Sequence, residues 1–164
     1  GTIGKMRSYY NLQDYRSAMA AATEVLALDL KNGSVIREAN YIKAKSLLAN
    51  GERENGSRIL EALAKEPADV YGAEAAYLLI LDAYDSGEFE KVENLTFALS
   101  DSGTPQTYWL AKSFITLGDS YAERDNLEQA RATFESIKEN YSPASQDDVI
   151  QQVDMRLGKL AKLQ

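Results

Sequence analysis

A spacing of 36 to 38 residues between turn positions is the feature that most constrains how this chain folds. Counting back from a turn at Asp125, equivalent turns fall at Gly87, Gly51 and Gln13. Residues of similar size recur at fixed distances from these turns and form four columns. The columns lie five residues after the turn (Ala18, Gly56, Val92, Ala130), two after (Tyr15, Arg53, Phe89, Leu127), nine after (Ala22, Leu60, Thr96, Phe134) and four before (Tyr9, Leu47, Ala83 or Tyr84, Tyr121). A repeat of this length indicates stacked structural units.

The composition and the spacing together predict an all-α fold. Only 3 prolines occur in 164 residues, and the abundant Ala, Leu, Glu and Lys favour helix. The turns divide the chain into about four antiparallel helix pairs and a closing helix. We expect helices near residues 2–11, 14–29, 34–49, 52–65, 70–85, 88–100, 105–123, 126–140 and 146–162.

The last of these segments has the pattern of an amphipathic capping helix. Its apolar residues recur at helical spacing with polar residues between them. They are Val149, Val153, Leu157, Leu160 and Leu163. Ser145 is expected as the N-cap, with Asp148 in a loose capping box. Such a helix covers the open edge of a repeat array.

The register predicts a single repeat domain over residues 1–164. Its units are expected near 1–33, 34–68, 69–104 and 105–143, followed by the capping helix at 146–162. The first pair begins abruptly and has no capping segment, so we expect the chain to be a fragment of a longer protein.

The clearest unit carries a recognisable set of residues. Phe114-x2-Leu117-Gly118-x2-Tyr121 is followed by Ala130-x3-Phe134 and then by Pro143. This pattern resembles the tetratricopeptide repeat, with Phe114 in place of the usual Trp and Pro143 one place late. The resemblance implies a right-handed superhelical solenoid. It covers residues 72–162 well and the first half of the chain loosely.

A narrower resemblance rests on the stretch from Tyr108 to Ile115, with Asp125-Asn126 and Gln129-Ala130. This stretch resembles the closing repeats of large tetratricopeptide proteins of the Bacteroidetes cell envelope. That resemblance alone implies a periplasmic or outer-membrane-associated location.

The resemblance also implies a binding surface, because the first helix of each pair lines the concave face in this family. Its positions here are Arg7, Tyr10, Glu38, Tyr41, Lys45, Leu48, Glu74, Tyr77, Leu81, Tyr84, Lys112, Ile115 and Asp119. Tyrosines among mixed charges suit a peptide, because Tyr combines a rigid apolar ring with a polar tip. The alternative for Tyr41, Tyr77 and Tyr84 is ordinary packing between helices.

One binding mode of this family is not expected. Some tetratricopeptide domains hold a C-terminal carboxylate with lysines and asparagines on these helices. The corresponding residues here are Arg7, Lys45, Leu81 and Asp119, which include no asparagine.

The charge excludes several classes of partner. The net charge is -7, with 18 basic residues against 25 acidic ones, whereas phosphate backbones require clustered Lys and Arg. The same acidity disfavours an anionic membrane surface. No apolar run approaches the ~20 residues that span a bilayer, so membrane insertion is not expected.

The residue types also argue against catalysis. The chain has no His and no Cys, which removes the commonest general base and nearly all zinc sites. The acidic residues Asp82, Asp85 and Glu88 fall at a helix end, where solvated carboxylates are normal. We therefore expect no enzyme activity, no metal and no cofactor.

Two functions remain open. The first is a scaffold that binds a protein or peptide of unknown identity on its tyrosine-lined face. The second is a structural unit that associates with itself or with further repeats through its N-terminal edge, around Met6, Tyr9 and Tyr10. Self-association raises the apparent mass with concentration, whereas a groove binder stays monomeric until its ligand is added.

Overall fold

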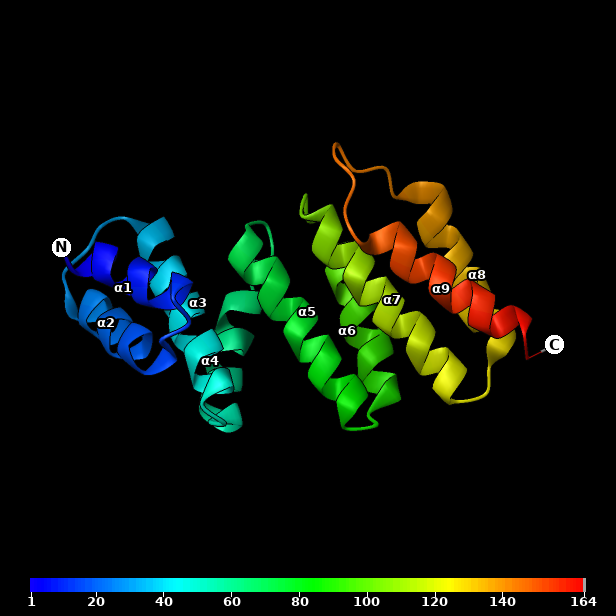
Figure 1. Cartoon of the computed structure of the whole chain (residues 1–164), viewed down its shortest axis with the longest axis horizontal. Helices are drawn as coiled ribbons and strands as arrows, with labels where there is room; N and C mark the ends of the chain where they lie inside the picture. The colour runs from blue at the N-terminus through cyan, green and yellow to red at the C-terminus, as the bar shows by residue number, and fades with distance from the viewer. Residues whose placement is uncertain (164) are drawn as a thin grey trace. The chain divides into compact units, whose positions relative to one another are not determined.

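A computed structural model describes residues 1–163 of the chain, and every regular element in this range is an α-helix (Figure 1). The helices are α1 (Thr2–Asn11), α2 (Tyr15–Ala27), α3 (Gly33–Ala49), α4 (Arg53–Ala64), α5 (Val70–Asp85), α6 (Phe89–Asp101), α7 (Thr107–Glu123), α8 (Leu127–Asn140) and α9 (Val149–Ala161). They pack sequentially in pairs, with α9 as an odd helix at the end. The all-α, paired architecture predicted from the sequence is confirmed.

The predicted turns are also confirmed, and their backbone explains the repeat. Gln13, Gly51, Gly87 and Asp125 all have positive φ, between 59° and 83°. Each lies just after a first helix and closes it in the same way. At the last turn, the N–H of Asp125 donates to the Ala122 carbonyl and the N–H of Asn126 donates to the Tyr121 carbonyl. This pair of bonds is the Schellman motif, which requires a left-handed residue after the helix.

Glycine at such a turn is favoured by the backbone conformation and not by crowding. A Cβ added at Gly87 would meet no atom within 4 Å, but its φ is +73°. We therefore expect Gly87→Ala to lower the free energy of unfolding by about 1 kcal/mol. Open space also surrounds Gly158 in α9, but its φ is not positive. Gly158→Ala should therefore raise the free energy of unfolding by about 1 kcal/mol. Urea denaturation of both variants checks the pair, and equal effects would contradict this account of the turn.

The chain divides into two compact units, Gly1–Glu66 and Pro67–Gln164. In the first unit, α2 packs against α1 and α3, and α3 packs against α4. The core of α1, α2 and α3 is rich in alanine. Its fully buried residues include Met6, Ala18, Ala22, Val25 and Ala39. Small side chains allow these helices to approach closely.

In the second unit the helices form two layers. The first helices α5 and α7 pack together, α9 packs on α7, and Figure 1 shows these three side by side. The second helices, α6 and α8, pack against them. The core between the layers contains Ile80, Val92, Leu117, Phe134 and Val153, all fully or almost fully buried.

Helices α7 and α8 cross closely at Gly118. A Cβ added at Gly118 would lie 2.4 Å from Cε1 of Phe134, a distance that no real side chain adopts. Ala130 and Phe134 are almost completely buried beside it. The glycine is therefore needed for the aromatic ring to fill this crossing, as the repeat pattern predicts.

The start of α9 differs from the expectation. The helix begins at Val149 with Asp148 as its N-cap, and Ser145 lies in the preceding loop, so the Ser145 cap is wrong. The carboxylate of Asp147 accepts a hydrogen bond from the Val149 N–H at 2.9 Å. The start of α9 is fixed by contacts of Asp148 with α7 and of Asp147 with Tyr141. Local capping preferences do not predict these contacts between distant residues.

Candidate partner-binding surfaces on the first-helix layers

In the first unit, the predicted residues of α1 and α3 lie next to each other. The Arg7 guanidinium forms a two-pronged ion pair with Glu38, with Nε–Oε1 and Nη2–Oε2 distances of 2.8 Å. About one turn further along these helices, the rings of Tyr10 and Tyr41 meet edge to face with centroids 6.1 Å apart. The Lys45 ammonium lies 5.7 Å from the centroid of the Tyr41 ring. The predicted tyrosines and charges therefore form one cluster on this face.

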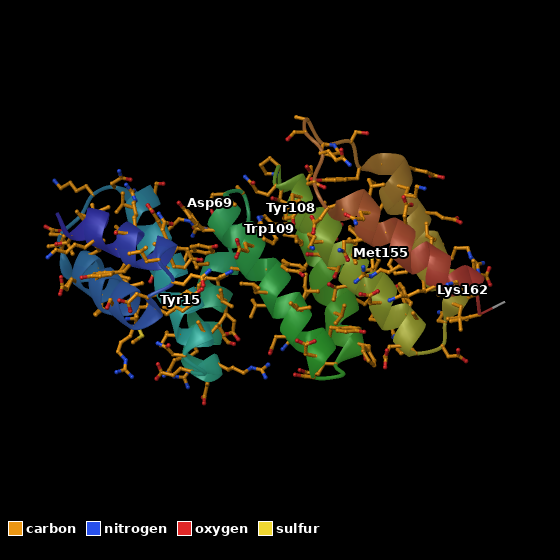
Figure 2. All side chains as sticks on the ribbon, viewed as in Figure 1. Tyr15, Asp69, Tyr108, Trp109, Met155 and Lys162 are labelled. Atoms are coloured by element: carbon orange, nitrogen blue, oxygen red, sulfur yellow. The ribbon has the colours of Figure 1, made fainter. Side chains whose placement is uncertain are left out.

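In the second unit, three aromatic rings gather where α5 and α7 pack. The Tyr77 ring lies 5.4 Å from the Trp109 ring at an interplanar angle of 37°. The Tyr108 ring meets Trp109 edge-on, at 4.9 Å and 84°. Tyr108 and Trp109 both project from the first turn of α7 (Figure 2), and all three side chains are partly exposed. We call these three residues the aromatic cluster.

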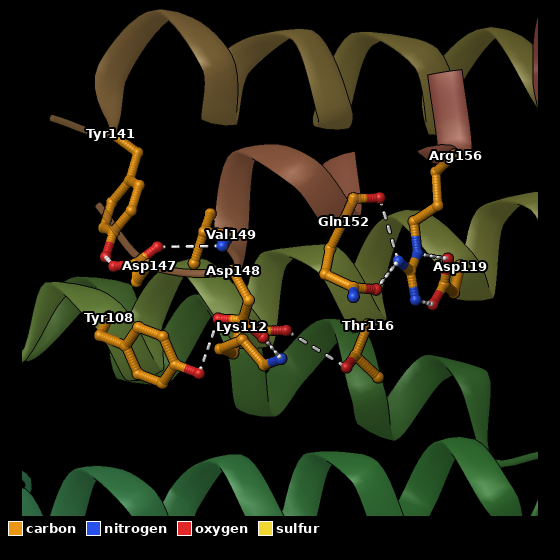
Figure 3. A network of polar contacts seen from close by, with 10 residues as sticks. All are labelled: Tyr108, Lys112, Thr116, Asp119, Tyr141, Asp147, Asp148, Val149, Gln152 and Arg156. Carbon is orange, nitrogen blue, oxygen red and sulfur yellow. Dashed lines mark hydrogen bonds and ion pairs between the residues drawn. The ribbon is translucent and has the colours of Figure 1, made fainter. Parts of the chain in front are cut away.

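A polar network joins the aromatic cluster to the start of α9 (Figure 3). The Tyr108 hydroxyl donates to Oδ1 of Asp148 at 2.9 Å, and the Lys112 ammonium donates to Oδ2 at 3.0 Å. The Tyr141 hydroxyl donates to the neighbouring carboxylate of Asp147. Two adjacent acidic residues thereby fasten the loop before α9 to α7 and to the end of α8.

A second ion pair fastens α9 further along. The Arg156 guanidinium binds both carboxylate oxygens of Asp119, at 2.7 and 3.0 Å, and also donates to the Gln152 side chain and backbone. About a quarter of each partner's side chain is exposed. Partial burial and the two-pronged geometry make this pair stronger than an ordinary surface salt bridge.

The comparison with known protein families identifies the segment that contains this network. The tetratricopeptide repeat family matches residues 108–143, which hold most of α7 and all of α8. This segment is similar to a tetratricopeptide repeat. Searches of characterised proteins and of solved structures gave no significant match.

The match supports the superfamily that the repeat pattern indicates, and it covers the unit with the clearest motif. It concerns no organism and no cellular location, so the resemblance to Bacteroidetes envelope proteins stays a prediction. Tetratricopeptide repeats generally mediate contacts between proteins and are typically not catalytic. In residues 1–163 there is no cluster of three or more potential metal ligands, and no helix is long and apolar enough to cross a membrane.

The remaining predicted residues of the repeat array have different surroundings. Ile115 is only 4% exposed and belongs to the core of the second unit, so its side chain is not part of an accessible surface. Lys112 and Asp119 face the α9 segment and are paired with it. Leu48 lies against Gly56, where an added Cβ would be 3.0 Å from its Cγ.

The third unit of the register supplies the other positions, all on α5. Glu74, Tyr77, Leu81 and Tyr84 lie on this helix. Tyr84 packs against the core of the second unit, with its ring 5.9 Å from that of Phe89. Burial, and next the negative charges of Asp119 and Glu123, raise the pKa of the Tyr84 hydroxyl. Tyr84 therefore matches the packing alternative, and Tyr41 also packs partly against the core of the first unit, whereas Tyr77 lies in the aromatic cluster.

Trp109 is the residue that the family positions missed. In the fourth unit, the first family position on the concave face is Lys112, about one helical turn after Trp109. The family positions therefore do not include Trp109. A signal was present, because Trp109 is the single tryptophan of the chain and directly follows Tyr108.

The network predicts a specific alkaline sensitivity. Burial and the hydrogen bond to Asp148 raise the pKa of Tyr108 from 10.0 to about 12. A raised pKa in the folded state stabilises the fold fully below pH 10.0, and this contribution is lost as the pH rises to about 12. We expect Tyr108→Phe to reduce the loss of unfolding free energy across this pH range, as measured by urea denaturation. An identical slope in the variant would contradict the assignment.

Asp148 is expected to make the stability of the fold depend on pH in the acid range. Partial burial alone would raise its pKa, but the hydrogen bonds from Lys112 and Tyr108 outweigh burial and hold the pKa below 3.8. Its contribution is therefore present above pH 3.8 and is lost as the pH falls through the lower folded value. Because the Asp148 side chain is 42% exposed, we expect a small effect. Asp148→Asn should flatten this limb of the stability profile.

Proposed function

We propose that the chain is a non-catalytic scaffold that binds a partner protein or peptide through the first-helix surfaces of its repeats. The observation that carries the proposal is the aromatic cluster of Tyr77, Tyr108 and Trp109, which is partly exposed on the first-helix layer of the second unit. Partly exposed Trp and Tyr side chains are the commonest anchors of protein interfaces. The match of residues 108–143 to a repeat family that generally mediates protein contacts supports the same conclusion.

The surface of the first unit is included in this proposal. Tyr10 and Tyr41 pair there, beside the Arg7–Glu38 ion pair and Lys45. Its mixture of rings and opposite charges suits a polypeptide better than a small apolar ligand.

An affinity enrichment compares wild type with the Tyr41→Ala/Tyr77→Ala variant. The envelope location implied by the family resemblance is part of the proposal, so a Bacteroidetes envelope extract is the source. The matched control is Phe97→Ala, because Phe97 is a 44% exposed aromatic residue on the second helix α6. We expect proteins captured by wild type and by the control to be lost with the double variant. Equal capture by all three chains would contradict the proposal, provided that circular dichroism shows the variants to be folded.

The second candidate is self-association through the N-terminal edge. Leu12, at the end of α1, is 74% exposed, which favours such a contact. Met6, however, is completely buried in the core of the first unit, so it cannot supply the edge that the sequence suggested. Light scattering separates the candidates. An apparent mass that rises with concentration in wild type, but stays at the monomer value in Leu12→Ser, would favour self-association.

A further inference from the structure

The two units carry very different charges. Gly1–Glu66 contains ten Lys and Arg against eight Asp and Glu, whereas Pro67–Gln164 contains eight against seventeen. The second unit therefore has a net charge of -9, which is more negative than the -7 of the whole chain. A field of this sign attracts positively charged partners and speeds their encounter.

Within this unit, two of the chain's own cations lie over aromatic rings and beside carboxylates. The Arg124 guanidinium lies 5.1 Å from the Tyr121 ring centroid and 5.8 Å from that of Phe89, and it pairs with Glu93 at 3.6 Å. Lys112 repeats the arrangement, with its ammonium 5.9 Å from the Tyr108 ring centroid and 3.0 Å from Asp148. Both sites combine a ring face with a negative charge, which is the arrangement that favours a cation.

Trp109 has aromatic neighbours but no such cation. Among residues 1–163, no Lys or Arg side chain lies over the Trp109 ring, although indole is the strongest ring acceptor of a cation. The tilted Tyr77 ring, 5.4 Å away, extends its aromatic surface. The partly exposed carboxylate of Asp148, which is bonded to the adjacent residue Tyr108, is already paired with Lys112.

We propose that the Trp109 and Tyr77 rings bind an Arg or Lys side chain of a basic partner polypeptide, with the net negative charge of the second unit favouring the cation. This inference rests on the proposed function and names its partner chemistry. The occupant is a basic peptide segment, because the unit carries a net charge of -9 and its Tyr108 and Tyr121 rings already accept cations from within the chain. An acidic peptide would be repelled by the same charges.

The single tryptophan makes the proposal directly measurable. Emission from Trp109 is recorded while the full chain is titrated with a short peptide of alternating Arg and Ser. Peptides of the same length with Glu or Gln in place of Arg are titrated in parallel. We expect saturable change in Trp109 emission with the Arg peptide alone, and weaker binding as the salt concentration rises. No saturable change with the Arg peptide would overturn the proposal.

Substitutions at Tyr77 test whether the cation of the peptide binds to the aromatic rings. Tyr77→Ala should weaken binding of the Arg peptide roughly tenfold, and Tyr77→Phe, which keeps the ring, should restore most of the affinity. Phe97→Ala is the matched control outside the cluster and should bind as wild type does. Equal affinities for Tyr77→Ala and wild type would overturn the proposal.

The two proposals fail in distinguishable ways. Saturable binding of the Gln or Glu peptide, lost with Tyr77→Ala, would keep the aromatic cluster as a peptide site and overturn its preference for basic partners. Absence of binding by all three peptides would overturn the basic-peptide site. The proposed scaffold function would then depend on whether the affinity enrichment still distinguishes the Tyr41→Ala/Tyr77→Ala variant.

Discussion

Replacing Phe134 by alanine is expected to lower the free energy of unfolding of the second unit by about 3–5 kcal/mol. Phe134 is 1% exposed and lies in the core between α7 and α8, with its ring against Gly118. Removing the ring eliminates buried apolar surface and leaves a cavity, because two crossed helices collapse only partly around it. Urea denaturation of the full chain measures the loss. A loss below about 1 kcal/mol would mean that this crossing is not packed as described.

The second large effect is expected at the other side of the same contact. Gly118→Leu should cost about 1–3 kcal/mol or more, since even its Cβ would lie 2.4 Å from the Phe134 ring. The ring cannot move away easily, because Phe134 is buried on all sides by the core of the second unit. Thermal or urea unfolding of the variant provides the measurement, and unchanged stability would mean that the repeat register is wrong. Gly158→Leu in α9 is the control for helix propensity, because open space surrounds that glycine.

Combining the two substitutions distinguishes crowding from a general loss of helix stability. In the double variant Gly118→Leu/Phe134→Ala, the introduced leucine side chain would enter the space that the ring vacates. We therefore expect the double variant to lose less stability than the sum of the single losses, with a coupling of at least about 1 kcal/mol. Additive losses would indicate that Gly118 and Phe134 do not share one packing site.

The helix pairs and their turns could be predicted from the sequence because they depend on local chemistry. The turns at Gln13, Gly51, Gly87 and Asp125 require positive φ, and residues of matching size follow them at constant distances. Small residues such as Gly118 are required wherever two helices cross closely. These constraints are repeated along the chain, so each unit strengthens the assignment of the others.

The candidate site was predicted less completely because it depends on contacts between distant segments. The family positions include Tyr10 and Tyr41, whose rings meet in the structure, but they cannot show that α9 pairs with Lys112 and Asp119. The loop between α8 and α9 is longer than the short turns within the helix pairs. The repeat spacing therefore does not predict where α9 lies. Ile115 shares a column with Tyr41 in the register, yet its apolar side chain packs into the core.

The polar network at α9 has a consequence for the aromatic cluster. Tyr108 is held by Asp148, and Trp109 packs edge-on against Tyr108 and tilted against Tyr77. Rings that are already fixed lose little conformational entropy when a partner binds. The same contacts that attach α9 therefore also prepare the proposed binding surface.

Site-specific photo-cross-linking tests the central claim most directly. A photoreactive phenylalanine analogue is placed at position 77 in the aromatic cluster, or at position 97 on α6 as the matched control, and each chain is irradiated in the extract used for enrichment. We expect cross-linked partner protein from position 77 and little or none from position 97. Cross-links from position 97 alone, or none from position 77 while wild type still captures the partner, would contradict binding through the first-helix surface.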